Sequence, residues 1–79
     1  MYYRRLRDLR EDMDMTQREI AGLLHVAQNT YRRYEIGQAQ IPSDCVILLA
    51  EFYHTSADYI LGRTDNPLPP GQRQGGRKA

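Results

Sequence analysis

Apolar residues recur through most of this chain at spacings of three and four positions, which places them on one face of an α-helix. The first such face belongs to a helix over about residues 3–13 and consists of Tyr2, Leu6, Leu9 and Met13. No stretch alternates apolar and polar residues over the length that would indicate a β-strand. The pattern therefore predicts an all-α fold.

Local signals divide this pattern into five short helices. The segment Thr16–Glu19 has the sequence of a capping box and predicts the start of the second helix. Gly37 follows a third helix, over about residues 28–36, at the position where a left-handed residue commonly ends a helix. Pro42 suits the first turn of a fourth helix, and a short fifth helix is expected after Ser56. Short connections between these helices predict a compact five-helix bundle.

The composition changes near residue 63. Residues 64–79 contain three Pro and three Gly and almost no apolar side chain, a composition that does not support a packed core. We therefore expect one folded domain over residues 1–63, followed by a disordered, basic tail over residues 64–79.

Composition also excludes several classes of protein. The longest apolar run, residues 45–50, is far shorter than the roughly 18 residues of a membrane span, and no secretory signal is evident. One cysteine and two histidines provide neither an internal disulfide nor a ligand set for a structural metal. The carboxylates between residues 8 and 14 lie at helical spacing from arginines, which indicates a solvated charged face and not a catalytic centre. We expect a cytoplasmic protein that is not an enzyme and uses no metal, cofactor or small-molecule ligand.

Charge is distributed unevenly although the formal net charge is only +1. Residues 38–61 carry three acids and no Lys or Arg, whereas residues 1–37 carry seven Arg and six acids. Any contact with a nucleic acid must therefore come from locally placed side chains and not from a global positive field.

The second and third predicted helices, joined by a turn of three to four residues, form a helix-turn-helix arrangement. At about 100° per residue, Tyr31 and Tyr34 point to one side of the third helix. The opposite side carries two amides and two guanidinium groups, those of Gln28, Asn29, Arg32 and Arg33. Amides match the major-groove edge of adenine and guanidinium groups match that of guanine. A polar helix face that is merely solvated is the alternative interpretation.

Gln17 begins the second helix. Backbone N–H groups and the helix dipole favour an anion at such a position, so we expect Gln17 to contact a phosphate.

The run from Thr16 to Gly37 resembles the lambda-repressor/Cro-like helix-turn-helix family, also called the XRE type, and the similarity covers about residues 3–65. The resemblance implies a lambda-repressor-like five-helix bundle that binds double-stranded, pseudo-palindromic operators, commonly as a dimer. It assigns Gln17 to the phosphate contact of the family. It assigns the reading of bases and backbone to Gln28, Asn29, Arg32 and Arg33, with Thr30 at the edge of this face.

The same resemblance implies that Arg10 pairs with Glu35, tying the first helix to the third. Three positions at helix ends depart from the family pattern: Ala27 replaces the usual cap Ser or Thr, and His25 and His54 replace glycines that follow helices.

Leu48 and Phe52 are apolar where the family often has polar residues. We expect them to form part of a homodimer interface together with Ile60. Scattered exposed apolar residues without a partner are the alternative.

The sequence therefore predicts a sequence-specific transcriptional regulator of bacterial or phage origin, acting as a repressor through the helix over residues 28–36. One recognition helix would read each half-site, with half-site centres about 34–36 Å apart. The alternative is a protein-interaction or antitoxin-like module that uses the same fold as a scaffold, which the low net charge favours. Salt dependence separates the two, because only phosphate contacts make affinity fall steeply with ionic strength.

Overall fold

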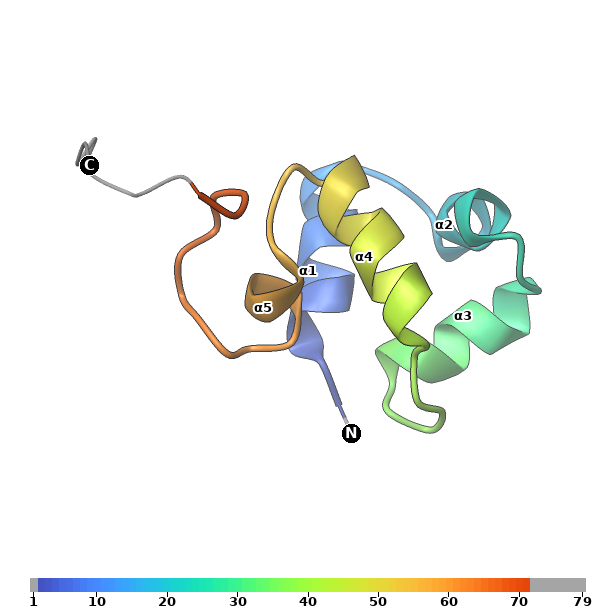
Figure 1. Cartoon of the computed structure of the whole chain (residues 1–79). Helices are drawn as coiled ribbons and strands as arrows, with labels where there is room; N and C mark the ends of the chain where they lie inside the picture. Colours follow the sequence, from blue (N-terminus) through green and yellow to red (C-terminus); the bar gives the residue numbers. More distant parts are fainter. Residues whose placement is uncertain (1, 72–79) are drawn as a thin grey trace.

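The computed structural model describes residues 2–71, which form five α-helices and contain no strand within that range (Figure 1). The helices are α1 (Arg4–Asp12), α2 (Gln17–Leu24), α3 (Gln28–Glu35), α4 (Ser43–Phe52) and α5 (Ala57–Ile60). This architecture confirms the predicted all-α, five-helix fold.

Each helix contributes one large side chain that is almost fully removed from solvent. These side chains are Leu6, Ile20, Tyr31, Leu49 and Ile60. Helix α2 packs on α3, α4 packs on α5, and α1 contacts both α3 and α5, so α1 joins the two helix pairs (Figure 1). The apolar stripe predicted for the first helix is correct only at its centre. Tyr2 and Met13 are exposed because α1 spans residues 4–12.

The helix ends follow the local sequence. The Thr16 hydroxyl accepts a hydrogen bond from the backbone N–H of Glu19 at 3.1 Å, and the Glu19 carboxylate accepts from the backbone N–H of Thr16 at 2.8 Å. Helix α3 begins after Ala27 without any side-chain cap. His25 and His54 have φ angles of 59° and 58°, in the left-handed region where glycine is least strained.

Arg5 connects the start of the domain to its end. Its guanidinium group donates to the carbonyl oxygen of Tyr59 at 2.8 Å, to that of Thr64 at 2.6 Å and to Asp65 Oδ1 at 2.7 Å. The same group lies 4.0 Å from the centre of the Tyr59 ring. The expected tail begins at residue 64, and its first two residues are bound to α1 through Arg5. Residues 72–79 of the expected tail lie outside the described residues.

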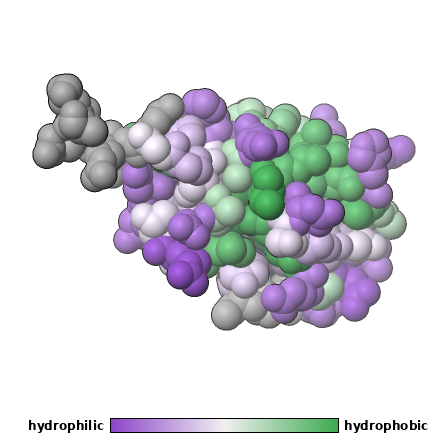
Figure 2. All heavy atoms as spheres, in the orientation of Figure 1, coloured by the Kyte–Doolittle hydropathy of each residue, from purple (hydrophilic) through white to green (hydrophobic). Residues whose placement is uncertain are grey.

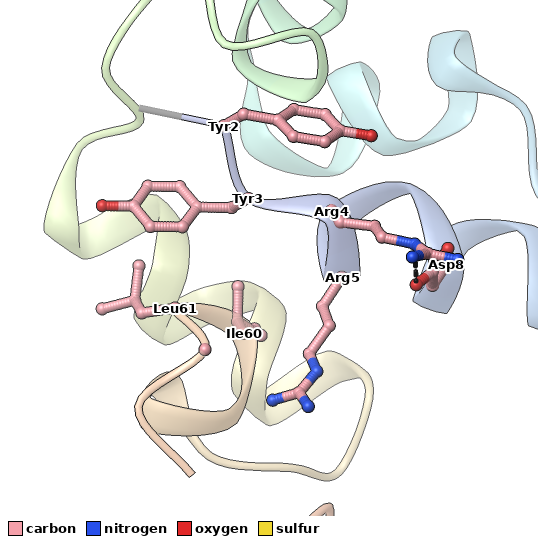
Figure 3. A pocket seen from close by; sticks show the side chains of 8 residues that line it. Tyr2, Tyr3, Arg4, Arg5, Asp8, Ile60 and Leu61 are labelled. Atoms are coloured by element: carbon pink, nitrogen blue, oxygen red, sulfur yellow. Dashed lines mark ion pairs between the residues drawn. The ribbon is translucent and has the colours of Figure 1, made fainter. Parts of the chain in front are cut away.

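A pocket of about 380 Å³ lies beside this contact, between the start of α1 and α5 (Figure 3). Its two arginines are already engaged, Arg4 with Asp8 at 3.5 Å and Arg5 with the chain that follows α5. We interpret this pocket as part of the packing between α1 and α5.

The described residues also bear on two other features, a membrane-spanning helix and a metal site. Within residues 2–71, no helix has the length and apolar character needed to cross a bilayer. Over the same residues, His, Cys, Asp and Glu side chains nowhere form a group of three that could hold a metal ion.

Candidate nucleic-acid interface

Helices α2 and α3 are joined by a tight turn of three residues. The backbone N–H of Val26 donates to the carbonyl oxygen of Ala21 at 3.0 Å, and that of His25 donates to Gly22 at 3.2 Å. The left-handed conformation of His25 reverses the chain at the end of α2, so α3 starts immediately beyond Ala27. The predicted helix-turn-helix is therefore present over residues 17–35.

Helix α3 has one buried and one exposed side. Tyr31 and Tyr34 are buried and their rings meet edge to face at 6.4 Å, and Glu35 is buried beside them. The opposite side is exposed and consists of Gln28, Asn29, Arg32 and Arg33, which we call the recognition face. Thr30 is partly exposed at its edge. The structure thus brings the expected base-reading residues together on one solvent-facing surface.

Arginines that lack a carboxylate partner concentrate on this helix pair. Five of the eight arginines in residues 2–71 form ion pairs with carboxylates, namely Arg4, Arg5, Arg7, Arg10 and Arg63. The other three are Arg18, at the first turn of α2, and Arg32 and Arg33 on α3, and all three are exposed. Positive charge that no acid neutralises therefore lies on the helix-turn-helix, although the net charge of the chain is only +1.

The sequence interpretation did not include Arg18 among the candidate DNA-contacting residues. The signal was present, because no acidic residue follows Arg18 at the positions three and four further along α2. Arg4 and Arg7, in contrast, have Asp8 and Glu11 at that spacing and are paired with them.

A buried ion pair links α1 to α3. Arg10 Nε donates to Glu35 Oε2 at 2.6 Å, and Arg10 Nη2 donates to Glu35 Oε1 at 3.2 Å. Burial by itself would raise the pKa of the Glu35 carboxyl, but the hydrogen bonds from Arg10 and Gln17 hold that pKa below its ordinary value. The same contact raises the pKa of Arg10, and burial together with Glu35 raises the pKa of Tyr31. The Arg10–Glu35 pair that the resemblance implied is present, and it fixes how α3 sits on the bundle.

Gln17, the first residue of α2, is hydrogen-bonded to the carboxylate of the same ion pair. Its Nε2 donates to Glu35 Oε1 at 3.1 Å, so the side chain is half-buried and oriented by the buried carboxylate. An amide nitrogen carries two protons, and the second remains available to a phosphate. Glu35 therefore orients the Gln17 side chain within the first turn of α2.

The expected dimer residues separate into two groups. Leu48 and Phe52 are 37% and 38% exposed on α4, and Ile47 of the same helix is 54% exposed. Apolar atoms gather over α4, which lies in front in this orientation (Figure 2). Ile60 is only 1% exposed, so its assignment to a dimer interface is wrong. It belongs to the core cluster, which also contains Val46 and Leu49 of α4.

Comparison with known proteins places this arrangement among helix-turn-helix domains. A family described as "Helix-turn-helix domain" matches residues 4–60. The chain is 39% identical over 74 residues to the uncharacterized HTH-type transcriptional regulator YobD of Bacillus subtilis (strain 168), covering 94% of this chain and 66% of that protein. It is 40% identical over 53 residues to the cryptic phage CTXphi transcriptional repressor RstR of Vibrio cholerae, covering 67% of this chain and 48% of that protein.

A further relative is the HTH-type transcriptional regulator ImmR of Bacillus subtilis (strain 168), which is 31% identical over 62 residues, 78% of this chain and 49% of that protein. The chain thus spans about half to two thirds of the length of these relatives. No solved structure matches it significantly.

Proposed function

The chain belongs to the helix-turn-helix family of the lambda-repressor/Cro-like (XRE) type, and on that basis we propose that it is a sequence-specific DNA-binding transcriptional regulator. The recognition face of α3 reads base edges in the major groove, and the first turn of α2 contacts the phosphate backbone. The protein acts as a repressor in the bacterial cytoplasm by occupying a promoter, which requires no catalysis. The relative from Vibrio cholerae is named a repressor, which supports this direction of regulation.

The observation that carries the proposal is the placement of the unpaired arginines. Phosphate contacts by Lys and Arg dominate affinity for DNA, and an arginine already paired with a carboxylate offers less charge to a phosphate. Arg18, Arg32 and Arg33 are the described arginines without such a partner, and they lie on the two helices that the fold offers to a duplex.

The exposed apolar residues of α4 support a homodimer on DNA. Ile47, Leu48 and Phe52 are exposed on this helix, whereas Val46 and Leu49 are buried. A dimer of this kind would present two α3 helices to a two-fold operator, whose half-site centres lie about 34–36 Å apart.

The same α4 surface is the observation that favours the second candidate function, a protein-interaction module. Residues 38–61 carry no Lys or Arg, so a complex formed only through α4 would not involve phosphate. Its affinity for a partner protein would change little with salt.

Selection of binding sites from a randomised duplex pool at low salt tests the proposed function. The proposal expects one enriched sequence with two-fold symmetry, and the absence of any enrichment would contradict it. With the selected duplex, Arg18→Ala should reduce the slope of log affinity against log salt by about one. Arg4→Ala is the matched control, because it removes one exposed arginine that is already paired with Asp8. Its slope should stay at the wild-type value.

A further inference from the structure

The buried carboxylate of Glu35 is bound by side chains from two other helices. Arg10 of α1 donates to both of its oxygens, at 2.6 Å and 3.2 Å, and Gln17 of α2 donates to Oε1 at 3.1 Å. Glu35 itself is the last residue of α3 and is 3% exposed. The first residue of α2 is therefore held by a buried group that belongs to the helix expected to read DNA.

The charge of Glu35 determines which end of the Gln17 amide faces it. The pKa of the Glu35 carboxyl is lowered, so the group is ionised at neutral pH and can only accept hydrogen bonds. The atom of the Gln17 amide that faces this carboxylate must therefore be the nitrogen. That nitrogen carries two protons in the plane of the amide, so fixing the direction of the first also fixes that of the second.

Gln17 differs in this respect from the other side chains that we expect to contact DNA. Arg18, in the same turn of α2, is exposed and forms no hydrogen bond with a side chain of residues 2–71. Asn29 Oδ1 accepts from Arg32 Nε at 3.2 Å, but both residues are exposed and belong to one helix. Within the described residues, Gln17 is the only member of this set that is bonded to a buried group on another helix.

We propose that Glu35 is a positioning residue for DNA binding, which acts through the Gln17 amide and orients its second N–H towards a phosphate of the DNA backbone. The inference rests on the proposed function, in which the first turn of α2 contacts phosphate. A long polar side chain that is ordered only on binding loses rotamer freedom, and this loss reduces affinity. The hydrogen bond to Glu35 orders Gln17 before the DNA binds, so the phosphate contact forms at a smaller entropic cost.

Arg10 makes this arrangement compatible with an anion. A lone carboxylate next to Gln17 would repel a phosphate, but the Arg10 guanidinium forms an ion pair with Glu35 at 2.6 Å and compensates its charge. Arg10 is 13% exposed, and its Nη1 also donates to the carbonyl oxygen of Met15 at 2.8 Å. The Arg10–Glu35 pair therefore acts on DNA binding through Gln17 and not through a contact of its own.

Removing the pair while keeping Gln17 tests this role. Arg10→Met combined with Glu35→Met removes both charges together with the acceptor of Gln17, and apolar replacement of a buried pair is often neutral for stability. Affinity for the selected duplex is measured for the wild-type protein and this double variant, each with and without Gln17→Ala. The double variant should bind about 2- to 12-fold more weakly for each half-site. In the Gln17→Ala background, removing the pair should leave the affinity unchanged.

Arg18→Ala is the matched control, because Arg18 lies in the same turn of α2 and does not contact Glu35. It should weaken binding by the same factor in the wild-type protein and in the double variant. If removal of the pair changed the cost of Arg18→Ala and that of Gln17→Ala alike, the pair would act on the whole helix-turn-helix and the specific role through Gln17 would be wrong. Circular dichroism verifies that each variant keeps its helices.

The side-chain amide of Gln17 provides a second readout, on the wild-type protein alone. In ¹⁵N spectra of the free protein, the Nε2 protons of Gln17 should differ in chemical shift from those of Gln28, which is exposed and forms no side-chain hydrogen bond with residues 2–71. One Nε2 proton of Gln17 should then shift further when the duplex is added. Identical side-chain amide shifts of Gln17 and Gln28 in the free protein would refute the inference even if the double variant did not fold.

The remaining outcomes are distinguishable from one another. An equal loss of affinity on removing the pair with and without Gln17 would show that the pair does not act through Gln17. A loss accompanied by a salt slope reduced by about one would assign it to a phosphate contact of Arg10 itself, which also overturns the inference. If Gln17→Ala did not weaken binding of a selected duplex, Gln17 would have no phosphate contact for Glu35 to position. Failure of the wild-type protein to enrich any sequence would refute the proposed function itself.

Discussion

Replacing Arg10 with Met should remove a large part of the free energy of unfolding, because it leaves the Glu35 carboxylate buried without its cation. The Glu35 side chain is 3% exposed and that of Arg10 is 13% exposed. Removing one member of a buried ion pair costs about 3–5 kcal/mol, and the partial exposure of Arg10 places the expected loss near the lower value. A chain of this length is stable by about 4–12 kcal/mol in total.

A double variant provides the control for this prediction. Arg10→Met combined with Glu35→Met removes both charges and keeps the side-chain volume. Replacing a buried pair with apolar residues is often neutral, so the double variant should recover most of the stability that Arg10→Met loses. Urea unfolding followed by circular dichroism measures all three proteins.

The pH dependence of the free energy of unfolding tests the same prediction. In the wild-type protein the pKa of Glu35 is lowered, so its carboxylate contributes stability above the ordinary value of 4.5 and this contribution is lost as the pH falls. In Arg10→Met burial dominates and should raise the pKa of Glu35 above 4.5. The destabilisation should then be small at low pH and grow as the pH rises. A loss below about 1 kcal/mol at neutral pH, with unchanged pH dependence, would refute the claim that the pair is desolvated.

The effects of five further substitutions follow from the fold. His25→Gly and His54→Gly should each stabilise the domain by about 0.5–1 kcal/mol in urea unfolding, because glycine is not strained at positive φ; no gain would contradict the strain. Ala27→Ser should add about 1 kcal/mol to the free energy of unfolding by capping α3. A stability equal to that of the wild-type protein would contradict this expectation. Arg5→Ala should cost about 2 kcal/mol and expose the chain after α5 to proteolysis, and equal protease resistance would argue against this contact. Leu48→Arg should shift the sedimentation of the protein towards that of a monomer. An unchanged dimer would exclude the α4 surface as the dimer interface.

Local signals predicted the helix-turn-helix correctly, because residues close in sequence determine it. The capping box of Thr16 and Glu19 and the two sides of α3 depend on contacts within a few positions, which helical spacing determines. The Asn29–Arg32 hydrogen bond has the same i,i+3 spacing and was within reach of the sequence.

Contacts between distant segments could not be predicted in this way. Arg5 and Asp65 are 60 positions apart, and no local pattern connects them. The error at Ile60 has a related cause, since α5 has only four residues and periodicity over one turn does not define a buried side. Tertiary contacts also determine which arginines remain unpaired. Glu35 lies three positions after Arg32 on α3, but its carboxylate pairs with Arg10 of α1.

A titration of the ¹⁵N-labelled chain with the selected duplex, followed by amide chemical shifts, tests most directly whether the helix-turn-helix is the DNA-binding surface. The largest changes should fall on Gln17 and Arg18 at the start of α2 and on residues 28–33 of α3. The outer side of α4 should change only where two copies meet. Large changes over α4 with unaffected amides in residues 28–33 would contradict the assignment of α3 as the helix that reads DNA.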